Sequence, residues 1–306
     1  MVLDVHGLQQ RSALLQAVRS FFIERNCLEV DTPIRLPTLL PEANILPFPS
    51  DGWFLQPSPE QCMKRLLARG CRHIFQICHC FRREESGRLH QPEFTMLEWY
   101  RSGWDYTGLM RECEQLLNAL ATAGLDLPGV APGPAIRRGG CLVDLAPPWE
   151  RLTVAEAFRR YAGIAVRDAL AAGDFDEVLV TLVEPHLGCE RPVFLSDYPV
   201  ELGSLARKSA ADPSVAERFE LYIAGIEIAN GFSELVDPNE QRHRFTGEIA
   251  AIRGRGDTAA MPEPFLADLE RLGDTAGIAL GLDRLFMLLQ GCATLDEALP
   301  FSCEEL

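Results

Sequence analysis

Apolar side chains recur at helical spacing in several parts of the chain. The first such segment predicts a helix over residues 10–25, with its apolar stripe at Leu14, Leu15, Val18, Phe21 and Phe22. Asn26 follows this segment, and Asn tolerates the left-handed conformation that ends many helices. Further helices are predicted over 106–120, 239–253 and 263–272.

A sequence typical of a helix start occurs near residue 58. Ser58 is expected to be the N-cap, Pro59 occupies the first helical position, and Gln61 falls at the capping-box position. The predicted helix ends at Gly70. A second capping box, Thr153 with Glu156, opens a stretch over about 150–190 that we expect to be a small helical insertion.

Other segments have the alternation or the turn signals of strands. Strands are predicted over 28–34, 73–82, 93–100 and 193–199, and a hairpin over 217–229 turns at Gly225. Pro33 lacks a backbone donor, so the first strand should lie at a sheet edge. Residues 121–140 are rich in Gly, Pro and Ala and indicate a connector. Strands joined by hairpins predict an α+β fold, an antiparallel β-sheet flanked by helices.

Composition agrees with an ordinary globular chain. The 306 residues are 47% hydrophobic and 24% charged. The chain has neither an apolar run of about 18 residues nor the pattern of a secretory signal, so we expect no membrane partner and a cytoplasmic location. Cys71, Cys78, His79 and Cys80 could suggest zinc, but HIFQICHCF (73–81) has the alternation of a strand, which favours packed thiols.

The charge balance bears on possible partners. The chain carries 44 acidic and 29 basic residues, for a net charge of −15. Nucleic acids are usually bound by a basic field, and the basic clusters here are short. This balance disfavours tRNA and suits a cationic substrate or a basic protein partner.

Residues 81–100, FRREESGRLHQPEFTMLEWY, are the most informative stretch. Period-two alternation places Phe94, Met96, Glu98 and Tyr100 on one face of a strand. A carboxylate on such a face needs a cation, because Glu is rarely buried without a partner. Arg82 and Glu84 alternate at the end of the preceding strand. An arginine, carboxylates and an aromatic ring on one hairpin suit nucleotide activation.

Two later segments add weaker signals. In GIEIANGFSEL (225–235), Glu227, Asn230 and Glu234 are oxygen ligands that would suit Mg²⁺ on ATP phosphates or an ammonium group, although Asn230-Gly231 alone is also a common turn. In GIALGLDR (277–284), Gly281 would allow a ligand to approach the backbone, and Arg284 lies near the start of a helix, where anions are favoured.

Taken together, these segments resemble motifs 2 and 3 of class II aminoacyl-tRNA synthetases, and RSFFIERNCLEVDTPI (19–34) resembles motif 1. Within these motifs, the amino-acid sequence is similar to that of the lysyl branch of the class. A lysyl-tRNA synthetase also carries an N-terminal anticodon-binding barrel, for which the sequence before motif 1 leaves no room. SPEQCMKRLLARGC (58–71) and VAERFELYIAGIEIANGF (215–232) resemble the elongation factor P–(R)-β-lysine ligase family. The expectation is therefore one catalytic domain over 1–306 without an anticodon-binding domain.

The resemblance implies a set of site residues. The implied catalytic residues are Arg82, Arg284 and Glu227. The implied ATP site comprises Arg82 on the α-phosphate, Glu84 and Phe94 at the adenine, Arg284 on the γ-phosphate, and Gln91, Glu227, Ile228 and Gly281. The implied amino-acid site comprises Ser58, Pro59, Glu60, Glu98, Tyr100, Glu234 and Ala279. Mg²⁺ would be held by Glu227, Asn230 and Glu234.

Two positions depart from the family pattern. Gln91 replaces the usual Asn and is one methylene longer, so its contact with ATP is in question. Ala279 stands where lysyl-tRNA synthetases tend to have Gly, and its methyl group would help to select β-lysine over α-lysine.

The implied activity uses ATP and Mg²⁺ to convert lysine or (R)-β-lysine to an adenylate, then transfers it to a lysine of elongation factor P. A homodimer is implied by motif 1. Two alternatives remain open: a truncated synthetase that charges tRNA, and a non-catalytic paralogue. Such paralogues typically lose the arginines that Arg82 and Arg284 represent, and both are present here.

Overall fold

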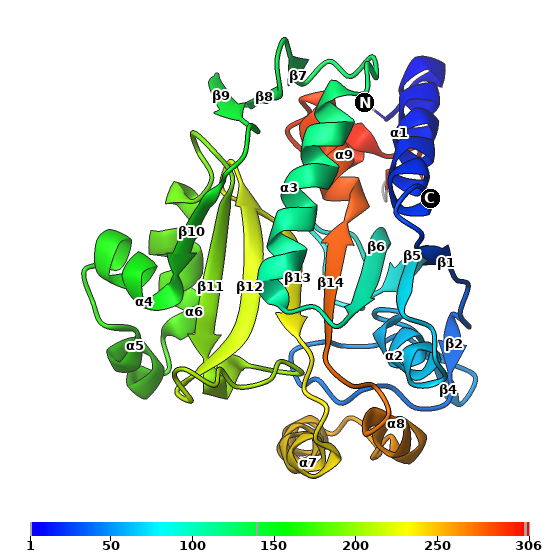
Figure 1. Ribbon diagram of the computed structural model, residues 1–306, viewed down its shortest axis with the longest axis vertical. Helices are drawn as coiled ribbons and strands as arrows, with labels where there is room; N and C mark the ends of the chain where they lie inside the picture. The colour runs from blue at the N-terminus through cyan, green and yellow to red at the C-terminus, as the bar shows by residue number, and fades with distance from the viewer. Residues whose placement is uncertain (1, 139, 303–304, 306) are drawn as a thin grey trace.

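The computed structural model describes residues 2–138, 140–302 and 305 of the chain. Within them, the central feature is an eight-stranded sheet in the order β1-β5-β6-β14-β13-β12-β11-β10, accompanied by two small sheets of three strands each (Figure 1). The five pairings from β5 to β11 are antiparallel, whereas the outermost pairs, β1 with β5 and β10 with β11, are parallel. The predicted α+β class with a mainly antiparallel sheet is confirmed.

The strands of the large sheet are β1 (Leu28–Glu29), β5 (His73–Phe81), β6 (Glu93–Ser102), β10 (Glu150–Thr153), β11 (Val193–Pro199), β12 (Val215–Ile223), β13 (Ile226–Ser233) and β14 (Thr275–Gly281). The small sheets contain β2 (Arg35–Leu36), β3 (Pro49–Ser50) and β4 (Trp53–Leu55), and β7 (Val130–Ala131), β8 (Ala135–Arg138) and β9 (Cys141–Asp144).

The α-helices are α1 (Val5–Ile23), α2 (Glu60–Ala68), α3 (Tyr106–Thr122), α4 (Val154–Ala157), α5 (Val166–Ala172), α6 (Phe175–Val178), α7 (Pro238–Gly254), α8 (Glu263–Leu269) and α9 (Leu282–Gln290). Shorter helical segments are η1 (Phe158–Ala162), η2 (Leu179–Val183), η3 (Glu184–His186), η4 (Val200–Leu202) and η5 (Leu295–Ala298). No helix in the described part of the chain is long and apolar enough to cross a membrane.

The two faces of the sheet have different roles. One face packs against α1, α3 and α9, where Phe22, Leu97 and Trp99 belong to the main hydrophobic core (Figure 1). Trp99 donates to Glu112 of α3 at 2.9 Å, which satisfies its buried indole. Helices α2, α7 and α8 pack together at one end of the sheet. The segment α4–η3 surrounds a separate apolar cluster against β10 and β11.

Three local predictions differ from the structure. The segment predicted as a strand over 28–34 pairs only at Leu28–Glu29, although this short strand does lie at the sheet edge. Helix α2 starts at Glu60 with Pro59 at the N-cap and no side-chain cap, so the capping role of Ser58 is wrong. The Pro59 carbonyl accepts from the Cys62 and Met63 amides, which are the first backbone hydrogen bonds of the helix. The predicted connector over 121–140 contains β7 and β8.

The hairpin of β12 and β13 has two features that position the site. Ala224 and Gly225 both have positive φ, as a two-residue hairpin turn requires. The register then shifts, so that Tyr222 pairs with Glu227 but Leu221 pairs with Ala229. This bulge leaves Ile228 as an extra residue. Glu227 and Asn230, three residues apart, are thereby brought to the same face of the sheet.

Candidate active site

The second face of the sheet is the wall of a cavity of about 760 Å³. Strands β6, β13 and β14 form this wall together with residues of β11 and β12. Residues of α2, α6, α7, α9, η4, the turn after β5 and the segment between β2 and β3 also line the cavity. The predicted face of β6 is confirmed, because its four alternating residues Phe94, Met96, Glu98 and Tyr100 all line the cavity. Carboxylates gather at one end of the cavity and arginines at another.

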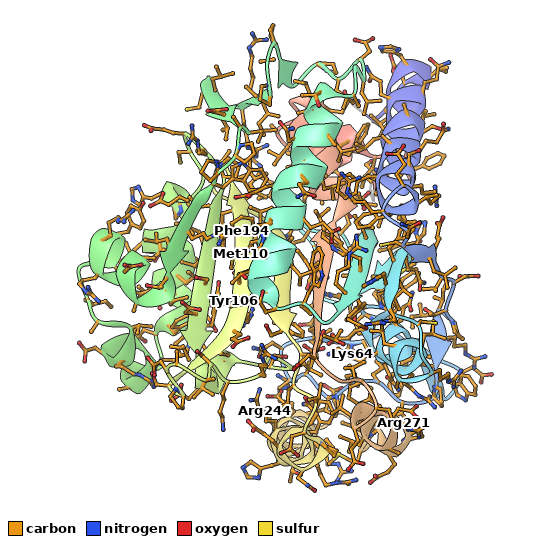
Figure 2. All side chains as sticks on the ribbon, viewed as in Figure 1. Lys64, Tyr106, Met110, Phe194, Arg244 and Arg271 are labelled. Carbon is orange, nitrogen blue, oxygen red and sulfur yellow. The ribbon has the colours of Figure 1, made fainter. Side chains whose placement is uncertain are left out.

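A buried lysine occupies the carboxylate-rich end. The Nζ atom of Lys64 lies 2.5 Å from Glu60, one helical turn away, and also contacts Glu234 after β13. Lys64 is 2% exposed and Glu234 is 1% exposed (Lys64 is labelled in Figure 2). Burial would lower the pKa of Lys64, but Glu234 and Glu60 together raise it above its usual value, so Lys64 carries a positive charge.

The same end holds more negative groups than Lys64 can neutralise. Burial, and then the neighbouring Glu60, raise the pKa of Glu98 well above its usual value, and the Tyr100 hydroxyl donates to Glu98 at 2.6 Å. Burial raises the pKa of Glu234 to about 8, against the opposing effect of Lys64. Its Oε1 atom accepts no hydrogen bond from any described residue. Carboxyl groups whose charge burial disfavours are suited to a bound ammonium group, because the cation favours their ionised forms.

A glycine makes room for these side chains. A Cβ atom on Gly277 of β14 would lie 2.2 Å from Cε1 of Tyr100 and 2.5 Å from Oε1 of Glu234. The phenol and the carboxylate therefore occupy space that any other residue at 277 would fill. Ala279, two residues further along β14, lines the cavity between its cross-strand partners Glu98 and Asn230.

Arg82 and Phe94 form the second part of the site. The Arg82 guanidinium lies over the Phe94 ring, 5.2 Å from its centroid, and pairs with Glu85 at 3.1 Å. Glu85 lines the cavity, whereas Glu84 is exposed on the turn and does not. The placement expected for Glu84 is thus not observed, because β5 ends at Phe81 and the alternation used to place Glu84 ends with it.

Arg284 enters the cavity from the first turn of α9. Its guanidinium donates to the Glu227 carbonyl at 2.9 Å, lies 3.4 Å from Oε2 of Glu227, and is 2.5 Å from Nε2 of His90. Gly281 is the N-cap of α9, and a Cβ atom there would meet only Arg284, at 3.8 Å or more. The space beside this helix start is open to a ligand.

The predicted magnesium set of Glu227, Asn230 and Glu234 is not brought together. Glu227 and Glu234 lie at opposite ends of β13, and at about 3.3 Å per residue they are roughly 20 Å apart along the strand. Among the described residues, no group of three or more His, Cys, Asp or Glu side chains could hold a metal ion. Glu220 instead lies near Glu227. It pairs across the strands with Asn230, while Glu227 pairs with Tyr222, two residues from Glu220 on β12. Burial, and then Glu220, raise the pKa of Glu227 to about 7.

The remaining predicted residues lie as follows. Ser58, Glu60, Gln91 and Ile228 line the cavity, whereas Pro59 is buried and does not. Gln91 donates to Asp296 at 2.9 Å. The Cys78 and Cys80 sulfurs are 3.9 Å apart, while His79 contacts Glu93 at 2.9 Å.

Several residues of the cavity region were missed from the sequence, among them Lys64, Glu85, Arg218 and Glu220. The spacing of Glu60 and Lys64 is that of an i, i+4 ion pair and could have indicated Lys64. Glu220 carries no such signal, since its place depends on the pairing of β12 with β13. The same holds for Arg218, which donates to Glu220 at 2.6 Å and to Asn230 at 3.3 Å.

Comparisons with known proteins agree with this geometry. Residues 5–305 match the family model of tRNA synthetases class II (D, K and N). An elongation factor P--(R)-beta-lysine ligase from Salmonella arizonae is 37% identical, over 98% of this chain and 96% of that protein. Proteins of the same name from Salmonella paratyphi B and Salmonella schwarzengrund are each 36% identical over the same shares. The chain belongs to the class II (D, K and N) tRNA synthetase family, within the group whose members are named elongation factor P--(R)-beta-lysine ligase.

Proposed function

We propose that the protein is an ATP-dependent ligase that activates (R)-β-lysine, or lysine, as an aminoacyl-adenylate and transfers it to the ε-amine of a lysine on elongation factor P. The observation that carries this proposal is the continuity of one cavity. Glu60, Glu98 and Tyr100 line one end of it, and Arg82 and Arg284 line the other. A diamino acid and a triphosphate can therefore occupy it side by side.

The charges of the amino-acid end suit a diamine. Glu60, Glu98 and Glu234 supply three carboxylates when ionised, and Lys64 supplies one ammonium group. Two further positive charges would neutralise the set. A diamino acid carries two ammonium groups, while its carboxylate would face the α-phosphate and the arginines. A neutral isostere would leave buried carboxylates without partners, which disfavours it.

In the proposed first step, a carboxylate oxygen of the amino acid attacks the α-phosphorus of ATP and pyrophosphate leaves. Arg82 would pair with the α-phosphate and Phe94 would stack on the adenine, as the contact between these two side chains supports. Arg284 would pair with the γ-phosphate. Positioning and charge neutralisation account for such a step without a covalent enzyme intermediate. Contact of Glu84 with the nucleotide would require the exposed turn after β5 to move.

Glu220 and Glu227 fit a magnesium ion better than the predicted set does. Both carboxylates line the cavity, and Glu227 pairs with Arg284. The negative charge of Glu220 raises the pKa of Glu227, so a cation between them would favour the ionised form. Mg²⁺ prefers one or two carboxylates together with phosphate oxygens and water. When bound, the ion would neutralise charge on the ATP phosphates.

The deciding experiment is mass spectrometry of elongation factor P after incubation with the protein, ATP and each lysine isomer. We expect one added residue on a single lysine, with (R)-β-lysine preferred. A parallel reaction offers tRNA as the acceptor. Labelling of tRNA alone would contradict the proposed acceptor, and absence of ATP–pyrophosphate exchange with every lysine isomer would contradict the proposed ligase activity.

We also propose a homodimer, formed along α1 and the sheet edge at β1. Val5, Ile23 and Leu28 on these elements are apolar and exposed, at 72%, 57% and 57%. Light scattering of the purified protein tests this, and a monomer mass would contradict it. We expect the reaction to take place in the cytoplasm, because its proposed acceptor is an elongation factor.

A further inference from the structure

One more carboxylate reaches the cavity from the segment between β2 and β3. Glu42 lies on this segment and lines the cavity. Neighbouring residues anchor it: the Ala43 amide donates to Glu248 of α7 at 2.6 Å, and the Arg83 amide donates to the Leu46 carbonyl at 2.8 Å. The segment therefore bridges α7 and the turn after β5, and it holds Glu42 in a defined place.

The groups around Glu42 come from three elements. Glu60 and Lys64 face it from α2, Arg82 from the end of β5, and Glu248 from α7. The Ser204 hydroxyl donates to its Oε2 atom at 3.4 Å, and no ion pair neutralises Glu42 within the part of the chain that the structure describes. Burial, and then Glu60, raise the pKa of Glu42 to about 7, while Arg82 and Lys64 oppose the rise. Such a group can accept a proton near neutral pH.

The position of Glu42 suggests which proton it accepts. It lies near both Glu60, at the amino-acid end, and Arg82, at the proposed α-phosphate position. The bond between these two groups in an aminoacyl-adenylate is the one that the acceptor amine must break. Glu98 and Glu234 are buried around the ammonium-binding end, and Glu227 faces Arg284 at the phosphate end. Of these carboxylates, Glu42 is the one with charged neighbours at both the proposed amino-acid position and the proposed α-phosphate position.

We propose that Glu42 is the general base of the transfer step, an inference that rests on the proposed function. The acceptor lysine arrives as a neutral amine after losing one proton to water. Its nitrogen lone pair forms a bond to the carbonyl carbon, and the bond from that carbon to the phosphate oxygen breaks, so that the electron pair leaves with AMP. The nitrogen must lose one proton to become an amide, and the Glu42 carboxylate takes it.

The test compares wild type with Glu42→Gln in three assays. ATP–pyrophosphate exchange reports adenylate formation. Single-turnover transfer to elongation factor P uses a chemically synthesised adenylate, so it does not depend on the first step. Cleavage of the same bound adenylate by hydroxylamine uses a weakly basic nucleophile, which is neutral at pH 7 and can lose its proton to water as the new bond forms. We expect transfer to fall on the order of 10²-fold or more, whereas exchange and hydroxylamine cleavage stay close to wild type.

Two further measurements exclude a purely structural role. On a logarithmic scale, wild-type transfer should rise with pH with a slope of about 2 below pH 7, where Glu42 and the acceptor amine both lose protons, and of about 1 above it, where only the amine does. This inflection near 7 should vanish in Glu42→Gln. Glu42→Asp, which retains a carboxylate, should restore part of the transfer rate. The matched control is Glu201→Gln, which removes an exposed carboxylate that lines the same cavity and pairs with Arg167 at 2.7 Å.

Several outcomes would overturn the inference. These are unchanged transfer in Glu42→Gln, a retained inflection, or an equal loss in all three assays, which would assign Glu42 to substrate binding. An equal loss of transfer in Glu201→Gln would show that the loss follows from removing any negative charge from the cavity, not from removing Glu42 in particular. Absence of ATP–pyrophosphate exchange by the wild-type protein would instead contradict the proposed function. Failure of the Glu42 inference and failure of the proposed function are therefore distinguishable.

Discussion

The ammonium group of Lys64 contacts the carboxylate of Glu234 in the protein interior, beside the cavity-lining Glu60, and the two side chains are 2% and 0% exposed. We expect Lys64→Met to lower the free energy of unfolding by about 3–5 kcal/mol, because it leaves Glu234 and Glu60 without their cation in a buried place. Urea unfolding followed by circular dichroism measures this loss.

A matched control is Arg65→Met, which removes a partly exposed partner of Asp268. It should cost far less, because partly exposed ion pairs contribute about 0–1 kcal/mol. The double variant Lys64→Met/Glu234→Gln should recover part of the stability. Equal losses of unfolding free energy in the two single variants would contradict the larger contribution expected of the buried Lys64 pair.

Binding of the diamino acid should depend on pH. Burial raises the pKa of Glu234 to about 8 and that of Glu98 well above its usual value, so the empty site favours the protonated forms of both. An incoming ammonium group favours the ionised forms, so binding releases protons. The affinity should therefore increase as pH rises from 6 to 8, by up to about tenfold per pH unit for each proton released. Calorimetry in two buffers of different ionisation enthalpy measures the release; equal heats in both would contradict it.

Gly277→Ala should abolish activation of the amino acid. The added methyl group would lie within van der Waals distance of both Tyr100 and Glu234, and crowding of this kind typically costs about 1–3 kcal/mol of stability. Pyrophosphate exchange and the melting temperature should both fall. Gly247→Ala is the control, since a Cβ atom there meets nothing within 4 Å. Wild-type exchange in Gly277→Ala would show that Tyr100 and Glu234 do not need their present positions.

Ala279→Gly should shift the choice between lysine isomers. Ala279 lies between Glu98 and Asn230 on the cavity wall, so its methyl group limits the space beside the substrate backbone. One methyl group in a pocket discriminates by about 1–3 kcal/mol. We expect the ratio of kcat/KM for α-lysine to that for (R)-β-lysine to rise in exchange assays. An unchanged ratio would remove Ala279 from isomer selection.

Removal of one carboxylate from the Glu220–Glu227 pair should raise the requirement for Mg²⁺. Glu227→Gln is the clearer variant, because Glu220 also accepts hydrogen bonds from Tyr198 and Tyr222. Exchange titrated with Mg²⁺ should reach half its maximum at a higher concentration in Glu227→Gln. In Glu234→Gln the amino-acid KM should change instead. A normal Mg²⁺ titration in Glu227→Gln would contradict the assignment.

Local pattern accounts for much of the architecture. The alternation of β6 correctly placed Phe94 and Tyr100 on one face, and Asn26 ends α1 with φ of 57° as expected. The turn at Gly225 and the helices α3, α7 and α8 were also predicted close to their observed bounds. These features follow from the residues next to one another along the chain, which is why sequence alone indicates them.

The sequence by itself determined the elements, the cavity-facing residues of β6 and the family resemblance. The tertiary structure alone decided which charges meet. Lys64 and Glu234 are 170 positions apart in the numbering, and Glu220 joins Glu227 only because the bulge at Ile228 sets the register of the hairpin. Contacts between distant residues depend on strand pairing and packing, which no local spacing encodes. There is a local reason why the predicted magnesium set is not brought together, since Glu227 and Glu234 lie at opposite ends of β13. Glu42, in contrast, gained its place from a segment held by α7.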